Sequence, residues 1–160
     1  MELTQEQSAR VQAQVPMIGL LNAFYKRFGG DAFQVSKEFS FQFGKQVEEN
    51  IKAGLNISGT DVNAVASVLN AFLMEASGAP IGVPDFVKVE GNEVTAANEG
   101  FCAIMEAVKV AGVPHEKICP NYSWSIFEGI ASAVNPQVRQ EVRESRAFGD
   151  KRCQHVIIVP

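Results

Sequence analysis

Three cysteines and two histidines are the first residues of this sequence to consider as nucleophile, base or metal ligand. They stand as Cys102, as the pair His115 and Cys119, and as the pair Cys153 and His155. A thiol reacts as its thiolate, which a neighbouring histidine, a lysine or a helix N-terminus favours. Cys119 meets this condition best, because it follows His115 and Lys117 and precedes a predicted helix. The alternative is that Cys119 is a small apolar residue that anchors a loop in the core.

The same residues bear on a metal site. No two cysteines have the close CxxC spacing of a zinc finger, so the fold would have to assemble a shared site. His115 and Cys119, like Cys153 and His155, place two zinc donors close together, and the second pair would share one face of a strand. We assign no metal ligands, and zinc stays an open alternative as a cofactor.

Two carboxylates in the last third of the chain are candidates for moving a proton. Glu128 lies in the predicted helix that follows Cys119, and Glu144 lies in a predicted strand. Because most carboxylates of a folded protein are solvated at its surface, that role is the alternative for each.

The first half of the chain is predicted to be helical. Apolar residues at three- and four-residue spacing predict helices over residues 4–28, 31–55 and 61–77, with Pro16 kinking or dividing the first. Asp31 is suited to cap the second helix, and Thr60 or Asp61 opens the third.

The second predicted helix has the most regular apolar row. Its members recur every four residues: Val35, Phe39, Phe43, Val47, Ile51 and Leu55. Phe33 and Phe41 lie off this row, which predicts that the helix is covered on more than one side or lines a pocket.

The second half predicts two hairpins. Residues 86–90 and 93–97 flank the two-residue turn Gly91-Asn92, and residues 138–148 and 153–159 flank a second turn.

Two further helices are expected between the hairpins, over residues 101–111 and 124–134. Asn121 or Ser123 is suited to cap the second of them, and Asn135-Pro136 ends it. Residues 79–84, which contain two prolines, are expected to form a rigid connector before the first hairpin.

These elements predict a single domain over residues 1–160 of the α+β class. A helical N-terminal half packs on a small antiparallel sheet formed by the C-terminal hairpins, with a small-molecule pocket between the layers. The 160 residues, 46% of them hydrophobic, are enough for a core without disulfide or metal staples.

Charge and termini exclude several classes of partner. The net charge of −4, from 18 acidic and 14 basic residues, disfavours nucleic acid and an anionic membrane surface. The N-terminus lacks a basic segment followed by an apolar one, and no apolar run could span a bilayer, so we expect a cytoplasmic protein with reduced thiols. The phenylalanine-rich helices leave apolar surface for a homodimer.

The C-terminal half carries a family resemblance in three segments: residues 119–130, Asn135-Pro136 and residues 144–155. A cysteine before a helix and a final hairpin with Gly-Asp-x-x-Cys, here residues 149–153, are similar to the tail of the L-2-amino-thiazoline-4-carboxylic acid hydrolase-like family. More distantly, the chain resembles four-vinyl-reductase-type small-molecule-binding domains. Cys102 lies where the family has an earlier cysteine, and the resemblance covers roughly residues 85–160.

The resemblance implies a hydrolase that acts on a carbon-nitrogen bond of a small cyclic amidine or related heterocycle. In that hypothesis Cys119 attacks or positions the ring carbon, and His155 or Glu144 moves the proton. The implied substrate pocket is lined by Cys102, Tyr122, Trp124, Cys153 and Phe43.

The alternatives are a non-catalytic, sensor-type small-molecule-binding domain and a structural module with separate, inert thiols. In phenol-sensing relatives of the binding domains, zinc is held by cysteines near these positions together with a glutamate and a further cysteine. This sequence has Glu144-Ser145 there, so the further cysteine is missing.

Overall fold

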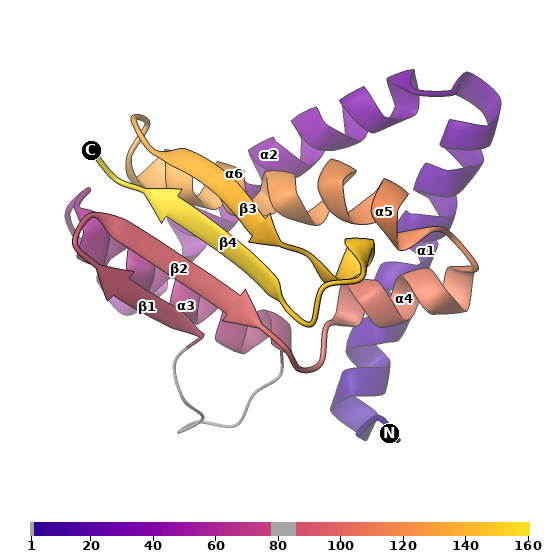
Figure 1. Ribbon diagram of the computed structural model, residues 1–160, viewed down its shortest axis with the longest axis horizontal. Helices are drawn as coiled ribbons and strands as arrows, with labels where there is room; N and C mark the ends of the chain where they lie inside the picture. The colour runs from indigo at the N-terminus through magenta and orange to yellow at the C-terminus, as the bar shows by residue number, and fades with distance from the viewer. Residues whose placement is uncertain (1, 78–85) are drawn as a thin grey trace.

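The computed structural model describes residues 2–77 and 86–160, so the expected connector over residues 79–84 lies outside the described residues. Along the chain, helices α1 to α3 come first, and the two hairpins follow with α4 to α6 between them (Figure 1). The elements are α1 Gln5–Phe28, α2 Asp31–Leu55, α3 Val62–Ser77, β1 Val87–Glu90, β2 Glu93–Asn98, α4 Ala103–Ala111, α5 His115–Ile118, the 3-10 turn η1 Cys119–Asn121, α6 Ser123–Val134, β3 Arg139–Glu144, the 3-10 turn η2 Arg146–Phe148 and β4 Cys153–Ile158.

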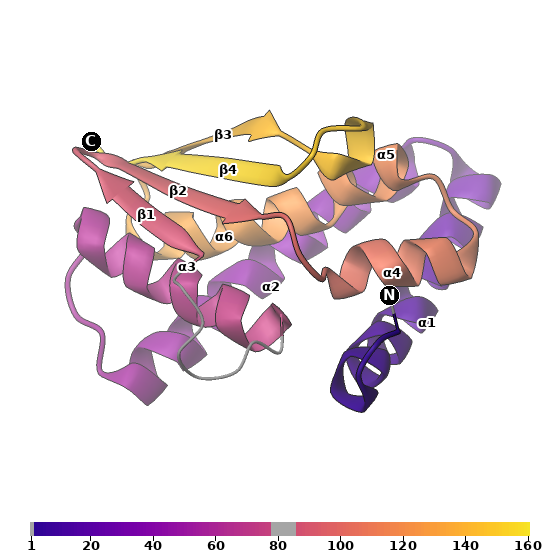
Figure 2. The ribbon, with the colours of Figure 1, turned by 60° about the horizontal axis from the view of Figure 1, so that its bottom comes forward.

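The two hairpins join into one antiparallel sheet with the strand order β1-β2-β4-β3. Helices α3 and α6 pack on one face of this sheet, and α2 packs along α6 on the side away from it (Figure 2). The register places Val94, Ala96 and Ile157 on the covered face, where all three are buried. The predicted α+β architecture is therefore confirmed.

Helix starts and ends follow local hydrogen bonding. Thr4 and Gln7 form a reciprocal capping box at the start of α1, and Asp61 Oδ1 accepts a bond of 2.9 Å from the Ala64 amide, as expected for the third helix. Of the two alternatives for Pro16, a kink or a division of the helix, the division is wrong, because α1 runs through Pro16 without a break. Pro16 lies on an exposed part of the helix, where the carbonyl that loses its intrahelical bond can be solvated.

Two expected caps are wrong. Asp31 is the first residue of α2 rather than its cap, and Tyr122 rather than Asn121 or Ser123 precedes α6. The Asn121 amide and the Ser123 hydroxyl instead donate to backbone carbonyls one turn earlier, at 2.7 and 3.3 Å, and so stabilise the turn before α6.

Helix α2 buries a different side from the one its large apolar residues suggested. Val35, Phe39 and Phe43 are exposed, whereas Ser40 and Gly44 are buried. The reason is the close approach of α6, which needs small residues at the crossing.

The last hairpin is also shorter than expected. Strand β3 ends at Glu144, because the Ser145 amide donates to Asp150 Oδ2 at 2.7 Å and the Asp150 amide donates back to the Ser145 carbonyl at 3.3 Å. Gly149, with φ of 97°, allows the chain to close this loop around η2.

Among the described residues, no helix combines the length and the apolar character needed to cross a membrane.

Candidate functional site

The fold brings the three cysteines into one cluster at the end of the sheet. Cys102 precedes α4, Cys119 begins η1 and Cys153 begins β4. They lie close enough that Cys102 and Cys153 both act electrostatically on Cys119, and Cys153 acts on Cys102. We call these three residues the thiol cluster. Cys119 is buried, and the other two are half-buried.

Asn98 determines where two of the thiols lie. It is the last residue of β2 and pairs with Cys153 across the sheet. Its side-chain amide donates to the Phe101 carbonyl at 3.0 Å, and its Oδ1 accepts from the Gly100 amide at 2.8 Å. The chain therefore turns directly from β2 into α4, with Cys102 at the helix start.

Arg146 of η2 is the cation whose charge acts on the thiols of Cys102 and Cys119. Its guanidinium donates to the Gly100 carbonyl at 2.6 Å, and α5 packs against η2. Its positive charge acts to lower the pKa of both Cys102 and Cys119. Sequence analysis missed this role, since Arg146 stands among several charged residues of a polar segment.

Burial has a larger effect than Arg146 on the pKa of these two thiols. Burial raises the pKa of Cys119 to about 12, with Cys102 and Cys153 adding in the same direction. Burial also raises the pKa of Cys102, although the amides of Met105 and Ile104 at the start of α4 oppose it. Both thiols are therefore protonated near neutral pH, which does not suit a nucleophile.

The two neighbours expected to favour a Cys119 thiolate interact elsewhere. The Nε2 atom of His115 lies 3.2 Å from the Met105 carbonyl oxygen, and Lys117 Nζ donates to the Tyr25 hydroxyl at 2.9 Å. Neither is among the groups that shift the Cys119 pKa.

We expect Cys119 to react slowly with a disulfide reagent such as Ellman's reagent at pH 7.5. With a pKa of about 12, its thiolate accounts for roughly one molecule in 10⁴ to 10⁵. In native buffer, the wild type and a Cys119→Ala variant should therefore react equally in the fast phase. In denaturant, the wild type should react with one more equivalent of reagent than the variant. A fast phase that disappears in the variant would contradict this prediction.

His155 lies two residues after Cys153 in β4. It is 5% exposed, and its ring stacks on Phe127 with centroids 4.3 Å apart and an angle of 10° between the planes. Trp124 meets it edge-on at 6.4 Å. No described residue forms a hydrogen bond with its Nδ1 atom, and burial lowers the His155 pKa to about 4. His155 and Cys153 share one face of the strand, as the strand period predicted, and the register shows that it is the helix-covered face.

The hydrogen bonds of Glu144 and Tyr122 involve residues outside the thiol cluster. Glu144 pairs with Gln154 in the register, which places it on the opposite face of the sheet from His155, and it forms two bonds of 3.0 and 2.8 Å with Arg152. Tyr122 is buried and donates to Gln14 Oε1 at 3.1 Å. Phe43 is exposed on α2.

The thiol cluster is not arranged as a metal centre. Within residues 2–77 and 86–160, no three His, Cys, Asp or Glu side chains lie close enough together to hold one ion.

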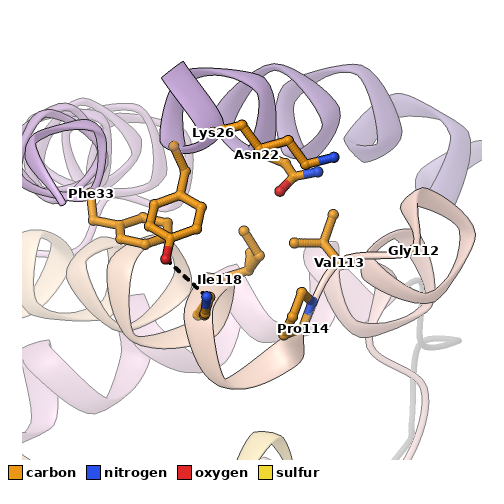
Figure 3. A pocket seen from close by; sticks show the side chains of 9 residues that line it. Asn22, Lys26, Phe33, Gly112, Val113, Pro114 and Ile118 are labelled. Carbon is orange, nitrogen blue, oxygen red and sulfur yellow. Dashed lines mark hydrogen bonds between the residues drawn. The ribbon is translucent and has the colours of Figure 1, made fainter. Parts of the chain in front are cut away.

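A cavity of about 200 Å³ lies elsewhere, between α1 and the segment that joins α4 to α5. Figure 3 shows Asn22 and Lys26 on α1, on the opposite side of the pocket from Val113, Pro114 and Ile118. The lining residues are Asn22, Tyr25, Lys26, Phe33, Gly112, Val113, Pro114, Lys117 and Ile118. We call this space the α1–α5 pocket.

The α1–α5 pocket is cationic at its polar end and apolar on its floor. Lys117 Nζ lies 4.5 Å from the centre of the Tyr25 ring as well as bonding its hydroxyl, and Tyr25 in turn stacks on Phe33 at 4.5 Å. Among the residues that the structure describes, no acidic one lines the pocket. Within the described part of the chain, neither Lys26 nor Lys117 forms an ion pair.

Sequence analysis did not find this pocket, because its two lysines are 91 positions apart in the chain (117 − 26). Asn22 gave a weak signal as a polar residue beside the apolar stripe of α1.

Comparison with known proteins adds no relative: no family model matches the chain, and no curated protein matches it.

Proposed function

We propose that this protein binds a small molecule that has an apolar body and one anionic group, and that the α1–α5 pocket holds it. The observation that carries this proposal is the pairing of an apolar floor with two lysines that have no acidic partner among the described residues. This is the binding alternative of the sequence analysis, with the ligand at a different place from the thiol cluster.

The size of the pocket supports a ligand of one ring. An engineered cavity of about 150 Å³ accepts benzene, so a space of about 200 Å³ fits one ring with a small substituent. Val113, Ile118 and Phe33 would contact the ring.

Charge supports an anionic substituent. Lys117 is held by the Tyr25 hydroxyl, so its ammonium group is positioned before a ligand arrives. A carboxylate would accept hydrogen bonds from this ammonium and from the Asn22 amide. A hydrogen bond to a charged group is worth about 1.5 kcal/mol, which corresponds to about tenfold in affinity.

We expect benzoate to bind about tenfold more tightly than benzamide, which has the same ring and no charge. Ligand-detected NMR titrations would measure both dissociation constants. Lys117→Met should remove most of the preference for benzoate and leave benzamide binding nearly unchanged.

Lys45→Met is the matched control. Lys45 also lies over an aromatic ring, 4.9 Å from the centre of Phe41, but it does not line the α1–α5 pocket. Equal binding of benzoate and benzamide, or a loss caused by Lys45→Met as large as that caused by Lys117→Met, would contradict the proposed site.

A hydrolase is the second candidate function, and the convergence of three thiols near Arg146 favours it. In such a reaction water would add to the amidine carbon, the bond from that carbon to nitrogen would break, and the nitrogen would leave with a proton. Chromatography of 2-aminothiazoline-4-carboxylate incubated with the protein tests this candidate. Ring opening by the wild type that is lost in Cys119→Ser would support the thiol as a participant.

A cytoplasmic location and a homodimer, both expected from the sequence, are also part of this proposal.

A further inference from the structure

Cys153 and Asn98 lie opposite each other on neighbouring strands of the sheet. They are partners in the antiparallel register of β2 and β4, so their side chains point to the same face, which is the helix-covered one. Residues directly opposite each other have Cβ atoms about 5 Å apart. The thiol of Cys153 therefore lies beside the Asn98 side chain.

The chain between Asn98 and Cys102 turns back onto that same side chain. Asn98 Nδ2 donates to the Phe101 carbonyl at 3.0 Å, and Asn98 Oδ1 accepts from the Gly100 amide at 2.8 Å. Cys102 follows directly, with an extended backbone, and precedes the first turn of α4. Asn98 thus holds the turn that carries Cys102 on the face of the sheet to which Cys153 points.

Solvent access separates these two thiols from the third. Cys102 and Cys153 are half-buried, whereas Cys119 is only 6% exposed. The turn over residues 149–151, just before Cys153, is exposed. A small oxidant therefore has access to Cys102 and Cys153 and is excluded from Cys119.

We propose that Cys102 and Cys153 form a redox site, at which a peroxide joins them in a reversible disulfide while Cys119 stays a thiol. The disulfide would tie the start of α4 to the start of β4. It requires Cβ atoms about 4 Å apart, which is close to the separation of opposite residues on paired strands. The proposal does not depend on the ligand of the α1–α5 pocket or on the hydrolase candidate.

Hydrogen peroxide is the oxidant in this reaction. The Cys153 thiolate attacks one peroxide oxygen, the oxygen–oxygen bond breaks, and a sulfenic acid and a hydroxide ion form. The Cys102 thiolate then attacks the sulfenic sulfur, so that the sulfur–sulfur bond forms and the sulfur–oxygen bond breaks with loss of a second hydroxide ion. The two thiol protons convert both hydroxide ions to water. Two sulfur atoms are oxidised, and the two peroxide oxygens are reduced.

The surroundings of Cys102 suit it to the second step. Burial raises the pKa of Cys102, and the amides of Met105 and Ile104 and the charge of Arg146 oppose that rise. A buried thiol is a poor first nucleophile toward a reagent in solution, but the second step takes place between two groups that the fold already holds together. The first attack therefore belongs to Cys153.

Peptide mass spectrometry after treatment of the reduced protein with hydrogen peroxide tests this proposal. Trypsin places the three cysteines in separate peptides, residues 89–109, 118–139 and 153–160. We expect the first and third peptides to be joined in the native protein and to separate after treatment with dithiothreitol. The second peptide should carry a free thiol that iodoacetamide alkylates once the protein is denatured.

Variants and denaturant provide the controls. Cys119→Ala is the matched control and should keep the link, whereas Cys102→Ala should remove it and leave a sulfenic acid at Cys153 that dimedone traps. Circular dichroism verifies that both variants are folded. In urea the shorter loop between Cys102 and Cys119 closes more readily, so the native pairing should no longer dominate.

Three results would overturn the proposal. The first is a link that contains Cys119 in the native protein. The second is a link between Cys102 and Cys153 that forms only between separate molecules, which gel electrophoresis without reductant detects. The third is oxidation of Cys153 to a sulfinic acid with no disulfide, because it would mean that the Cys102 thiol does not reach Cys153.

Discussion

Gly129→Ala is expected to lower the free energy of unfolding by about 3 kcal/mol or more, because no room exists for a methyl group at this position. A Cβ atom at Gly129 would overlap the carbonyl oxygen of Phe41 and lie 2.9 Å from its carbonyl carbon. These atoms belong to the backbone of α2, so relief requires that α2 and α6 move apart. The loss is a large part of the total stability of a domain, which is about 5–15 kcal/mol.

Gly44 meets α6 from the other side of the same crossing. A Cβ atom there would overlap the Ile126 carbonyl oxygen and lie 2.9 Å from the Ile130 nitrogen. Gly44→Ala should therefore cost a similar amount, and the two helices depend on both glycines.

Gly19→Ala is the matched control for these variants. Gly19 lies inside α1 with no atom within 4 Å of an added Cβ. This substitution should stabilise the protein by about 1 kcal/mol, because alanine has the higher helix propensity. Urea unfolding followed by circular dichroism, at one fixed protein concentration, measures all three variants. A Gly129→Ala protein within 0.5 kcal/mol of the wild type would show that the crossing is looser than described.

The crossing of α2 and α6 explains the main difference between the sequence-based prediction and the structure. Periodicity predicted the helices and the first hairpin well, because both depend on short-range spacing and turn residues. Periodicity identifies which residues share a side of a helix, but it does not identify which side is covered. In α2 the buried side contains Ser40 and Gly44, and the row that contains Phe39 is largely exposed.

The candidate site was predictable only in part. The strand period placed Cys153 and His155 on one face correctly, since this depends on two neighbouring residues. The convergence of Cys102 and Cys119 on Cys153 depends on the turn at Asn98 and on the packing of α5 against η2, which are long-range features. The burial that raises the Cys119 pKa follows from the same packing, so it had no signal in the local sequence.

His155 should make the protein about 3 kcal/mol less stable at pH 4 and below than it would be with a non-titrating residue. An unfolded histidine titrates near pH 6.5, whereas burial lowers the pKa of folded His155 to about 4. Between these two values the unfolded chain binds more protons than the folded one. The free energy of unfolding is therefore unaffected by this residue above pH 6.5 and falls as the pH decreases toward 4. Below the folded pKa, protonation of His155 causes no further loss.

The variant that tests this prediction is His155→Leu, which replaces the ring with an apolar side chain of similar volume. Because no described residue bonds the His155 Nδ1 atom, the replacement should cost little at pH 7.5. The free energy of unfolding, measured in urea from pH 7.5 to 4, should then fall less steeply in the variant than in the wild type. The carboxylates would account for the slope that remains.

The other histidine of the chain provides the comparison. His115 is half-buried, with Nε2 3.2 Å from the Met105 carbonyl oxygen. His115→Leu should leave the steep loss of stability between pH 6.5 and 4 in place. Parallel curves for the wild type and His155→Leu would mean that water or a rearranged Trp124 accommodates the charged ring. In that case His155 would not be the residue that limits stability in acid.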